Sequence, residues 1–115
     1  MKTIKVSEAS GPALDWMVAK ANQAAGLIKS DPMLDCMNYF TPTTNWAQGG
    51  PIIDREELTL SHSPYDHVSY GRTRPWCAEK KSRMEYGPTP LIAACRCYVA
   101  SKLGDEVEVP GELTS

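Results

Sequence analysis

The first group of side chains that could do chemistry surrounds a tryptophan near the middle of the chain: Trp46, Gln48, Gly49, Gly50 and Pro51, with Trp76 as a further candidate. Indole rings stack on planar ligands such as nucleobases. A pair of glycines lets a ligand approach backbone N–H groups, which suit phosphate oxygens. This group therefore predicts a binding site for a small anionic ligand with a planar part. A structural alternative stays open, in which Trp46 closes the edge of the core and the glycines form a turn.

The second group is basic and holds five of the twelve lysines and arginines of the chain: Arg72, Arg74, Lys80, Lys81 and Arg83. Cations gathered in this way can clamp phosphates, and arginine does so through its bidentate fork. The alternative is a solvated edge of a loop. Arg96 stands apart, because it falls within a predicted helix beside the apolar stripe. We expect it to face a carboxylate or a ligand and include it in the predicted binding site.

Catalysis has weaker support in the sequence. Carboxylates and imidazoles that could transfer protons are present at Asp54, Glu56, Glu57, His62, Asp66 and His67. The two histidines share no triad or metal spacing, and no serine nucleophile elbow, phosphate-binding loop or zinc-protease motif occurs. We assign no catalytic residues and expect a binding protein rather than an enzyme. A small hydrolase that uses Glu56, His62 or His67 remains an alternative.

The four cysteines do not follow the spacing of a metal site. Cys36 and Cys77 are isolated, and Cys95 and Cys97 lie two apart on a predicted helix, so they point in different directions. We interpret all four as reduced structural thiols. A zinc site built from Cys36, Cys77 and a histidine is the open alternative. No metal and no other cofactor is therefore predicted.

Composition limits the class of protein. The chain has 115 residues, 42% of them hydrophobic, which predicts one domain over 1–115 with a single modest core. The formal net charge of −2 argues against a protein that binds duplex nucleic acid by neutralising phosphates. The N-terminus lacks the apolar core of a signal peptide, and no run approaches the roughly 18 apolar residues that span a bilayer. We expect no membrane partner and a soluble, intracellular protein.

Two helices can be predicted from their ends. The first runs over about 12–25, with Ser10 as the cap candidate, Pro12 in the first turn and Gly26 as the stop. The second runs over 90–103, with Thr89 as the cap, Pro90 at the first position and Gly104 at the end. Both carry an apolar stripe with helical spacing.

The remaining elements are short. Alternation predicts paired strands at 58–61 and 76–79, separated by a long loop at 63–75 that we expect to be functional or mobile. Further strand candidates are 27–29 and 38–40, with 33–37 ambiguous between them, and 3–6 is a strand or the approach to a helix. Pro51 is predicted to start a short helix after Gly50. We expect a solvated basic stretch at 80–83, a stiff approach to the last helix at 86–90, and a docked arm with a frayed end at 105–115. The predicted fold is an α/β sandwich, a small antiparallel sheet packed with two main helices.

Four segments together resemble a known family: Ala13-Leu14-Asp15-Trp16, the run from Thr43 to Ile53 (TTNWAQGGPII), the run from Gly87 to Ala94 (GPTPLIAA) and the run from Arg96 to Gly104 (RCYVASKLG). In order and spacing they resemble the NinX-like proteins of tailed phages and prophages, a family of unknown function. The chain is also similar to the small phage ABA-sandwich domains. The resemblance covers nearly the whole chain, except for 27–40 and 63–83.

This resemblance implies expression in the cytoplasm of an infected bacterium and no established activity. Our leading hypothesis is a non-enzymatic phage accessory protein that binds a small anionic, nucleotide-derived ligand. By analogy with other small phage proteins, it would sequester a signalling nucleotide of bacterial immunity and so counter host defence. The rival is a protein–protein module that inhibits a host protein through exposed aromatic residues. A short sheet with an exposed edge also favours a homo-oligomer, either a C2 dimer or a higher assembly.

Overall fold

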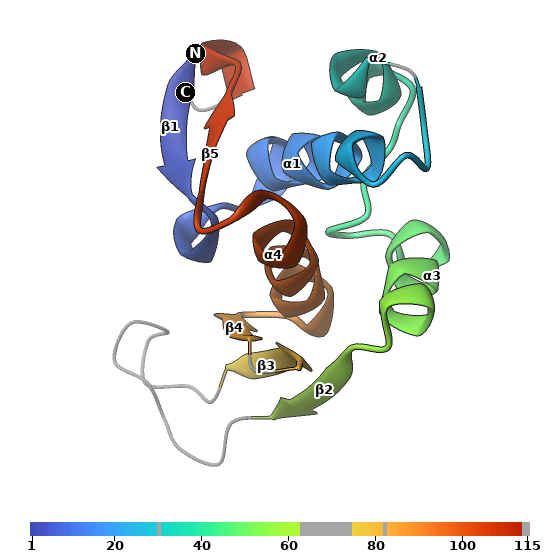
Figure 1. The fold of residues 1–115 in the computed structure, drawn as a ribbon, viewed down its shortest axis with the longest axis vertical. Coiled ribbons are helices and arrows are strands. Elements are labelled where there is room, and N and C mark those ends of the chain that lie inside the picture. The colour runs from blue at the N-terminus through green and yellow to red at the C-terminus, as the bar shows by residue number, and fades with distance from the viewer. Residues whose placement is uncertain (30, 63–74, 82, 114–115) are drawn as a thin grey trace.

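The computed structural model describes residues 1–29, 31–62, 75–81 and 83–113, and its helices and strands follow the order β1–η1–α1–α2–α3–β2–β3–β4–α4–β5–η3 (Figure 1). The helices are α1 (Gly11–Ala24), α2 (Pro32–Met37), α3 (Trp46–Glu56) and α4 (Pro90–Leu103), with short 3-10 turns η1 (Val6–Glu8) and η3 (Gly111–Leu113). The strands are β1 (Lys2–Lys5), β2 (Thr59–His62), β3 (Trp76–Lys80), β4 (Arg83–Gly87) and β5 (Glu106–Val109). The described chain is an α+β fold.

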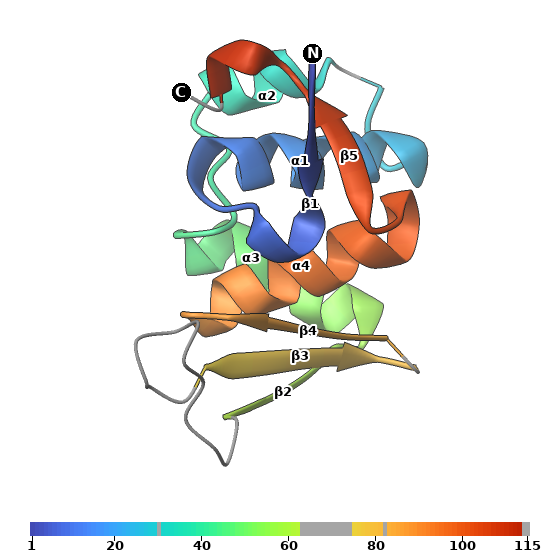
Figure 2. The same cartoon turned by 90° about the vertical axis from the view of Figure 1, so that its left-hand side faces the viewer.

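Helix α4 lies at the centre of the molecule. One side of it covers the sheet formed by β2, β3 and β4, and its other side packs on α1, with α3 alongside (Figures 1 and 2). Most residues of α4 are buried, including Tyr98 and Val99, because it has packed neighbours on both sides. The larger apolar core lies between α1, α4 and β5, and a smaller cluster around Ala78 and Cys97 lies between α4 and the sheet.

The strands form two antiparallel sheets. In the three-stranded sheet β3 is central, with Thr59 opposite Glu79 and Trp76 opposite Gly87. The two-stranded sheet joins both ends of the chain, since β1 pairs with β5 and Lys2 lies opposite Val109. The predicted antiparallel sheet with two main helices is therefore confirmed, and the pairing of the termini adds a second sheet that we did not predict.

The two helices predicted from their ends are present. The first begins one residue earlier than expected, at Gly11, and the second runs over Pro90–Leu103 as predicted. The Thr89 hydroxyl oxygen accepts a hydrogen bond from the N–H of Ile92 at 3.1 Å, which caps α4. The strands predicted at 58–61 and 76–79 are also confirmed, shifted or extended by one residue.

The segment before α3 differs from our prediction. Neither 27–29 nor 38–40 forms a strand, and the ambiguous residues between them belong to α2. The reason is local, because Asp31 caps this helix by accepting from the N–H of Met33 at 2.8 Å, and Pro32 occupies its first position. Tyr39 has a φ of 65°, a left-handed backbone just past the end of α2 that an extended strand does not allow.

The helix predicted to start at Pro51 starts five residues earlier. Asn45 is its cap, with the side-chain oxygen accepting from the N–H of Ala47 at 2.9 Å, so Trp46 is the first residue of α3. Pro51 lies inside this helix, and Gly49 and Gly50 are helical residues rather than a turn. The structural alternative in which the two glycines form a turn was therefore wrong.

Two further differences concern the region around α4. Residues 83–87, predicted partly as a solvated stretch and partly as a stiff approach to α4, form strand β4. The docked arm predicted after Gly104 is strand β5. Most of the loop predicted at 63–75 lies outside the described residues, and so do Arg72, Arg74, Asp66 and His67.

Candidate functional site

An apolar pocket of about 270 Å³ opens beside Trp46, between the starts of α3 and α4. The indole is 56% exposed although it is one of the largest apolar side chains of the molecule. The pocket is lined by residues of the two helix starts and of the segment before α3: Thr43, Thr44, Trp46, Thr89, Pro90, Leu91 and Ile92. A large aromatic ring left half in solvent beside a pocket is a common feature of binding surfaces.

Backbone donors also collect at this pocket, because two helices begin there. The N–H groups of Trp46 and Leu91 donate to no acceptor among the described residues. Asn45 satisfies the N–H of Ala47, and Thr89 satisfies that of Ile92. Helix starts carry a partial positive charge and favour anions. The pocket therefore combines an aromatic face with two positive helix ends.

A buried carboxylate holds in place one of the residues that line the pocket. Asp15 on α1 is 6% exposed and accepts the backbone N–H of Thr43 at 3.0 Å. Burial raises the pKa of Asp15 above its ordinary value, and the N–H and hydroxyl of Thr43 partly offset this. The Thr43 hydroxyl is buried without a hydrogen bond of good geometry, yet it lies near enough to the carboxylate to lower its pKa.

Gly49 lets α3 approach α4 and the preceding loop closely. A Cβ atom at this position would lie 2.6 Å from both the Leu91 Cδ2 atom and the Pro42 carbonyl oxygen. Gly50 is different, because a Cβ there would meet nothing within 4 Å. Gly49 therefore sets the distance between the two helix starts, and we find no steric requirement for glycine at Gly50.

Gln48 holds the loop before α3 rather than opening toward the pocket. Its side-chain oxygen accepts from the N–H of Thr41 at 2.6 Å, and its amide donates to the carbonyl of Tyr39 at 3.1 Å. Pro51 is exposed on α3 and does not line the pocket. Of the predicted group at 46–51, the structure brings Trp46 to the pocket, and Gly49 and Gln48 support its shape.

Arg96 and Trp76 occupy other places. Arg96 is 6% exposed, and its guanidinium donates to the carbonyls of Ala9 at 2.9 Å and Tyr86 at 2.8 Å, so it ties η1 and β4 to α4. Trp76 is half-buried at the start of β3 and meets the His62 ring edge-on, with centroids 4.1 Å apart. Neither residue lines the Trp46 pocket.

Glu56 lies within a group of cations at the end of α3. It forms ion pairs with Lys80, with Arg55 at 3.1 Å and with Lys102 at 3.4 Å. Burial alone would raise the pKa of Glu56, but Lys80, Arg55 and Lys102 together lower it to about 2. A carboxylate with this pKa stays ionised near neutral pH and is a weak proton acceptor, so Glu56 is a poor candidate for acid–base chemistry.

The cysteines lie in apolar surroundings. Cys77, Cys95 and Cys97 are buried, and burial is the main cause that raises the pKa of Cys95 to about 12 and of Cys97 to about 11. These thiols are therefore protonated near neutral pH, as expected of small buried apolar residues. No group of three His, Cys, Asp or Glu side chains that could hold a metal occurs within the described ranges.

The two predicted binding groups lie apart among the described residues. The Trp46 pocket is at the N-terminal end of α4, whereas Lys80, Lys81 and Arg83 share a hollow with its C-terminal residues Ser101 and Lys102. About ten residues of helix separate the two places, which corresponds to roughly 15 Å. One small ligand therefore cannot contact both.

Sequence reasoning missed most of the residues that line the pocket, namely Thr43, Thr44, Thr89, Pro90, Leu91 and Ile92. It also missed Asp15, which holds Thr43 in place. The sequence does contain a local signal for the two helix starts at the pocket, since Asn45 and Thr89 are both good helix caps. Recognising Asn45 as a cap would have placed Trp46 at a helix start. The hydrogen bond between Asp15 and Thr43 joins residues 28 positions apart, so no local sequence pattern could predict it.

Comparison with known proteins gives one family. A family profile described as "Bacteriophage P22, NinX" matches residues 5–102. No curated protein matches the chain. Within the described part of the chain, no helix is both long and apolar enough to cross a membrane. Since the profile spans most of the sequence, the chain belongs to the bacteriophage P22 NinX family.

Proposed function

We propose that this phage protein binds a small, anionic, nucleotide-derived ligand in the Trp46 pocket without changing it chemically. The observation that carries the proposal is the half-exposed indole of Trp46 beside an apolar pocket at two helix starts. The ring offers a stacking face for a base, which contributes about 1–3 kcal/mol where it has been measured by substitution. The adjacent helix starts favour the negative charge of a phosphate.

The ligand would lie with its base against Trp46 and its phosphate toward Thr44 and Thr89. Both threonines line the pocket, and their hydroxyls can donate to phosphate oxygens while the Thr89 oxygen keeps its bond from Ile92. The N–H groups of Trp46 and Leu91 supply further donors at the same helix starts. Apolar contacts from Leu91 and Ile92 complete the pocket.

Sequestration is the use we propose for this binding. The protein would act in the cytoplasm of the infected bacterium and hold a signalling nucleotide away from host immune effectors. Membership of a phage family supports an action inside the host. The low pKa of Glu56 supports binding without hydrolysis, because this carboxylate is a weak base.

Equilibrium dialysis against a panel of cyclic nucleotides and cyclic ADP-ribose tests the proposal, followed by mass spectrometry of the ligand released by heat. We expect one member of the panel to be retained and released with unchanged mass. Retention of no member would overturn the proposal, and release of a cleaved product would favour a hydrolase instead.

Trp46→Ala and Trp46→Phe locate the site. We expect Trp46→Ala to weaken binding by roughly tenfold or more and Trp46→Phe to retain part of it, since a smaller ring still stacks. Tyr39→Ala is the matched control, because Tyr39 is 85% exposed and does not line the pocket. An equal loss in Tyr39→Ala and Trp46→Ala would argue against stacking in this pocket.

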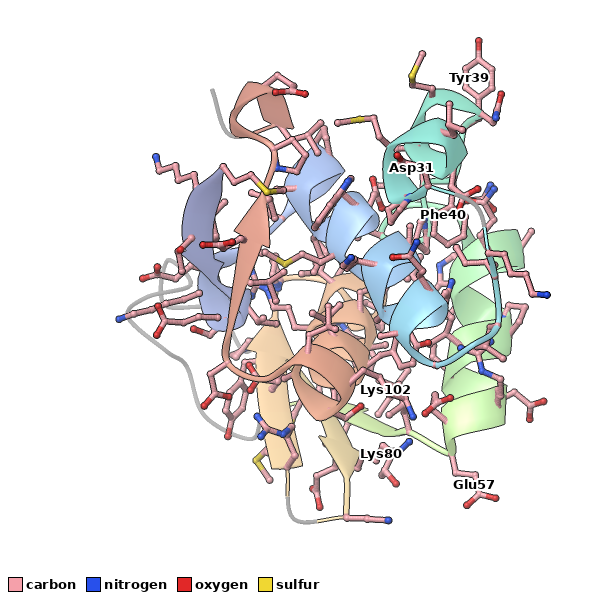
Figure 3. All side chains as sticks on the ribbon, turned by 45° about the horizontal axis from the view of Figure 1, so that its top comes forward. Asp31, Tyr39, Phe40, Glu57, Lys80 and Lys102 are labelled. Atoms are coloured by element: carbon pink, nitrogen blue, oxygen red, sulfur yellow. The ribbon has the colours of Figure 1, made fainter. Side chains whose placement is uncertain are left out.

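A protein partner is the second candidate function, and a separate surface favours it. The side of α2 that faces away from α1 carries exposed apolar residues, namely Leu34, Met37 and, just past the helix, Tyr39. Figure 3 shows Tyr39 projecting from the end of α2 while Phe40 lies nearer the body of the molecule. A pull-down with wild type and Tyr39→Ala decides between the two functions, because a protein interface here would lose its partner in the variant whereas nucleotide binding would not change.

We further propose that the protein assembles as a homo-oligomer. Strand β2 forms one edge of the three-stranded sheet and is short and mostly exposed, so its outer backbone groups can pair with another strand. Light scattering coupled to size-exclusion chromatography would measure the mass. A monomer at all concentrations tested would exclude this part of the proposal and leave the ligand site unaffected.

A further inference from the structure

A hollow of about 330 Å³ lies at the end of α4 opposite the Trp46 pocket. Its lining is lysine-rich and comes from two separate parts of the chain: Lys80, Lys81 and Arg83 at the turn between β3 and β4, and Ser101 and Lys102 in the last turn of α4. We call this surface the basic hollow. Figure 3 shows Lys80 and Lys102 on the same side of the molecule as Glu57, the residue that follows α3.

The cations around the basic hollow outnumber the carboxylates that pair with them. Glu56 is shared by Lys80, Lys102 and Arg55, and Asp105 pairs with Arg83 at 2.7 Å. Each lysine ammonium has three donor hydrogens, so sharing one carboxylate leaves Lys80 and Lys102 with donors for another anion. Glu85 on β4 is a further carboxylate beside the group; burial raises its pKa, and nearby Arg83 partly offsets this.

Lys81 contributes a cation from an unusual backbone position. It lies between the paired residues Lys80 and Arg83 with a φ of 56°, in the left-handed region where glycine or asparagine is favoured. It forms no ion pair with another described residue. A strained position held by a charged residue supports a role for its side chain.

Ordinary structural reasons explain single members of the group but not their convergence. A lysine in the last turn of a helix interacts favourably with the helix dipole, which accounts for Lys102. The ion pair with Glu56 accounts for Lys80. The ion pair with Asp105, which follows α4, accounts for Arg83. None of these reasons applies to Lys81, which lines the same hollow without an ion pair to another described residue.

We propose that the basic hollow binds a pyrophosphate group, two linked phosphates, at a site distinct from the Trp46 pocket. Several closely spaced ammonium groups match an anion that carries more than one charge and many oxygen acceptors. The hollow is polar and at the small end of ligand-site volumes, which suits a pyrophosphate rather than a base. The group can be free inorganic pyrophosphate or the terminal part of a nucleoside diphosphate, since both present the same oxygens.

Isothermal titration calorimetry of the full chain with inorganic pyrophosphate tests this proposal. We expect saturable binding that weakens as salt increases, because counterions screen the lysines. Lys81→Asn removes one charge and suits the left-handed backbone, so the fold is retained; we expect it to weaken binding by roughly tenfold, the effect of losing a charge-assisted hydrogen bond. Lys29→Ala is the matched control, because it removes the same charge from an exposed residue outside the hollow.

The outcomes separate the two proposed sites. Binding that survives Trp46→Ala but weakens in Lys81→Asn supports the basic hollow, even if no nucleotide binds at Trp46. Equal weakening in Lys29→Ala and Lys81→Asn would show a general charge effect and overturn the proposal, and so would the absence of heat at low salt. A nucleoside diphosphate that binds like pyrophosphate while orthophosphate binds more weakly would identify the linked pair as the recognised group; tighter binding of orthophosphate would contradict it.

Discussion

The carboxylate of Asp15 on α1 accepts the backbone N–H of Thr43 across 28 positions of sequence, at 3.0 Å. Both residues are almost fully buried, so this hydrogen bond is shielded from water and tethers the segment before α3 to the core. Thr43 lines the Trp46 pocket, and α3 begins three residues later. The position of Trp46 therefore depends on a carboxylate that does not itself line the pocket.

Asp15→Ala should lower the free energy of unfolding by about 1–3 kcal/mol, because the Thr43 N–H would be buried without its acceptor. Asp15→Asn keeps an acceptor oxygen and should therefore destabilise the protein less than Asp15→Ala does. Urea unfolding of both variants measures the difference, with Asp54→Ala as the control at an exposed carboxylate of α3. Equal stability of Asp15→Ala and wild type would contradict the role of this bond.

The raised pKa of Asp15 predicts that the stability of the protein depends on pH. Burial raises the pKa of Asp15 in the folded state above its ordinary value of 3.8, so the folded state binds the proton more tightly than the unfolded one. Its contribution to stability is therefore largest below 3.8 and declines as the pH rises through the folded pKa. Asp15→Asn should remove this decline, which unfolding curves measured across the acid range will show as a flatter profile.

Gly49 and Gly50 form a matched pair on one helix. Gly49→Ala should destabilise the protein by about 1–3 kcal/mol, because its methyl group would meet Leu91 and the Pro42 carbonyl at 2.6 Å. Gly50→Ala should be neutral or stabilising by up to about 1 kcal/mol, because it has open space and alanine favours a helix. Thermal unfolding measures both, and a stabilising Gly49→Ala would show that the close approach is not required.

Glu56 predicts the opposite pH dependence to Asp15. Its ion pairs with Lys80, Arg55 and Lys102 lower its pKa to about 2 from 4.5, so its stabilising effect is complete above 4.5 and is lost as the pH falls toward 2. Glu56→Gln should lower the free energy of unfolding by about 1–2 kcal/mol at neutral pH. This is less than the pKa shift of Glu56 would imply, because the cations are partly solvated. The difference from wild type should shrink in acid; a difference that does not change with pH would argue against the ion pairs as its cause.

Arg96 should act on stability rather than on ligand binding. Arg96→Lys and Arg96→Met should each lower the free energy of unfolding by about 2–3 kcal/mol, because a lysine cannot reach the carbonyls of both Ala9 and Tyr86 in the same geometry. Lys29→Met is the control, since Lys29 is exposed and forms no ion pair with another described residue. A stable Arg96→Lys variant that loses nucleotide binding would instead place Arg96 at the ligand.

Local signals in the sequence were sufficient for α1, α4 and the β2–β3 pair. Thr89, Pro90 and Gly104 mark both ends of α4 because a cap, a proline at the first position and a terminal glycine each act within one helical turn. In 58–61 the alternation reflects a leucine face that is buried or half-buried and exposed Thr59 and Ser61, whereas Cys77 and Ala78 of the central strand β3 are both buried. Membership of the phage family was also predicted from short motifs and is confirmed by the family profile.

Tertiary contacts decided the remaining features. The pairing of β1 with β5 joins Lys2 to Val109, and no local pattern encodes a partner so far along the chain. The sequence led us to expect a carboxylate or a ligand at Arg96, and the packing of η1 and β4 supplied the carbonyls of Ala9 and Tyr86. The Trp46 pocket exists because two helix starts meet in space, and caps predict where helices begin but not which of them become neighbours.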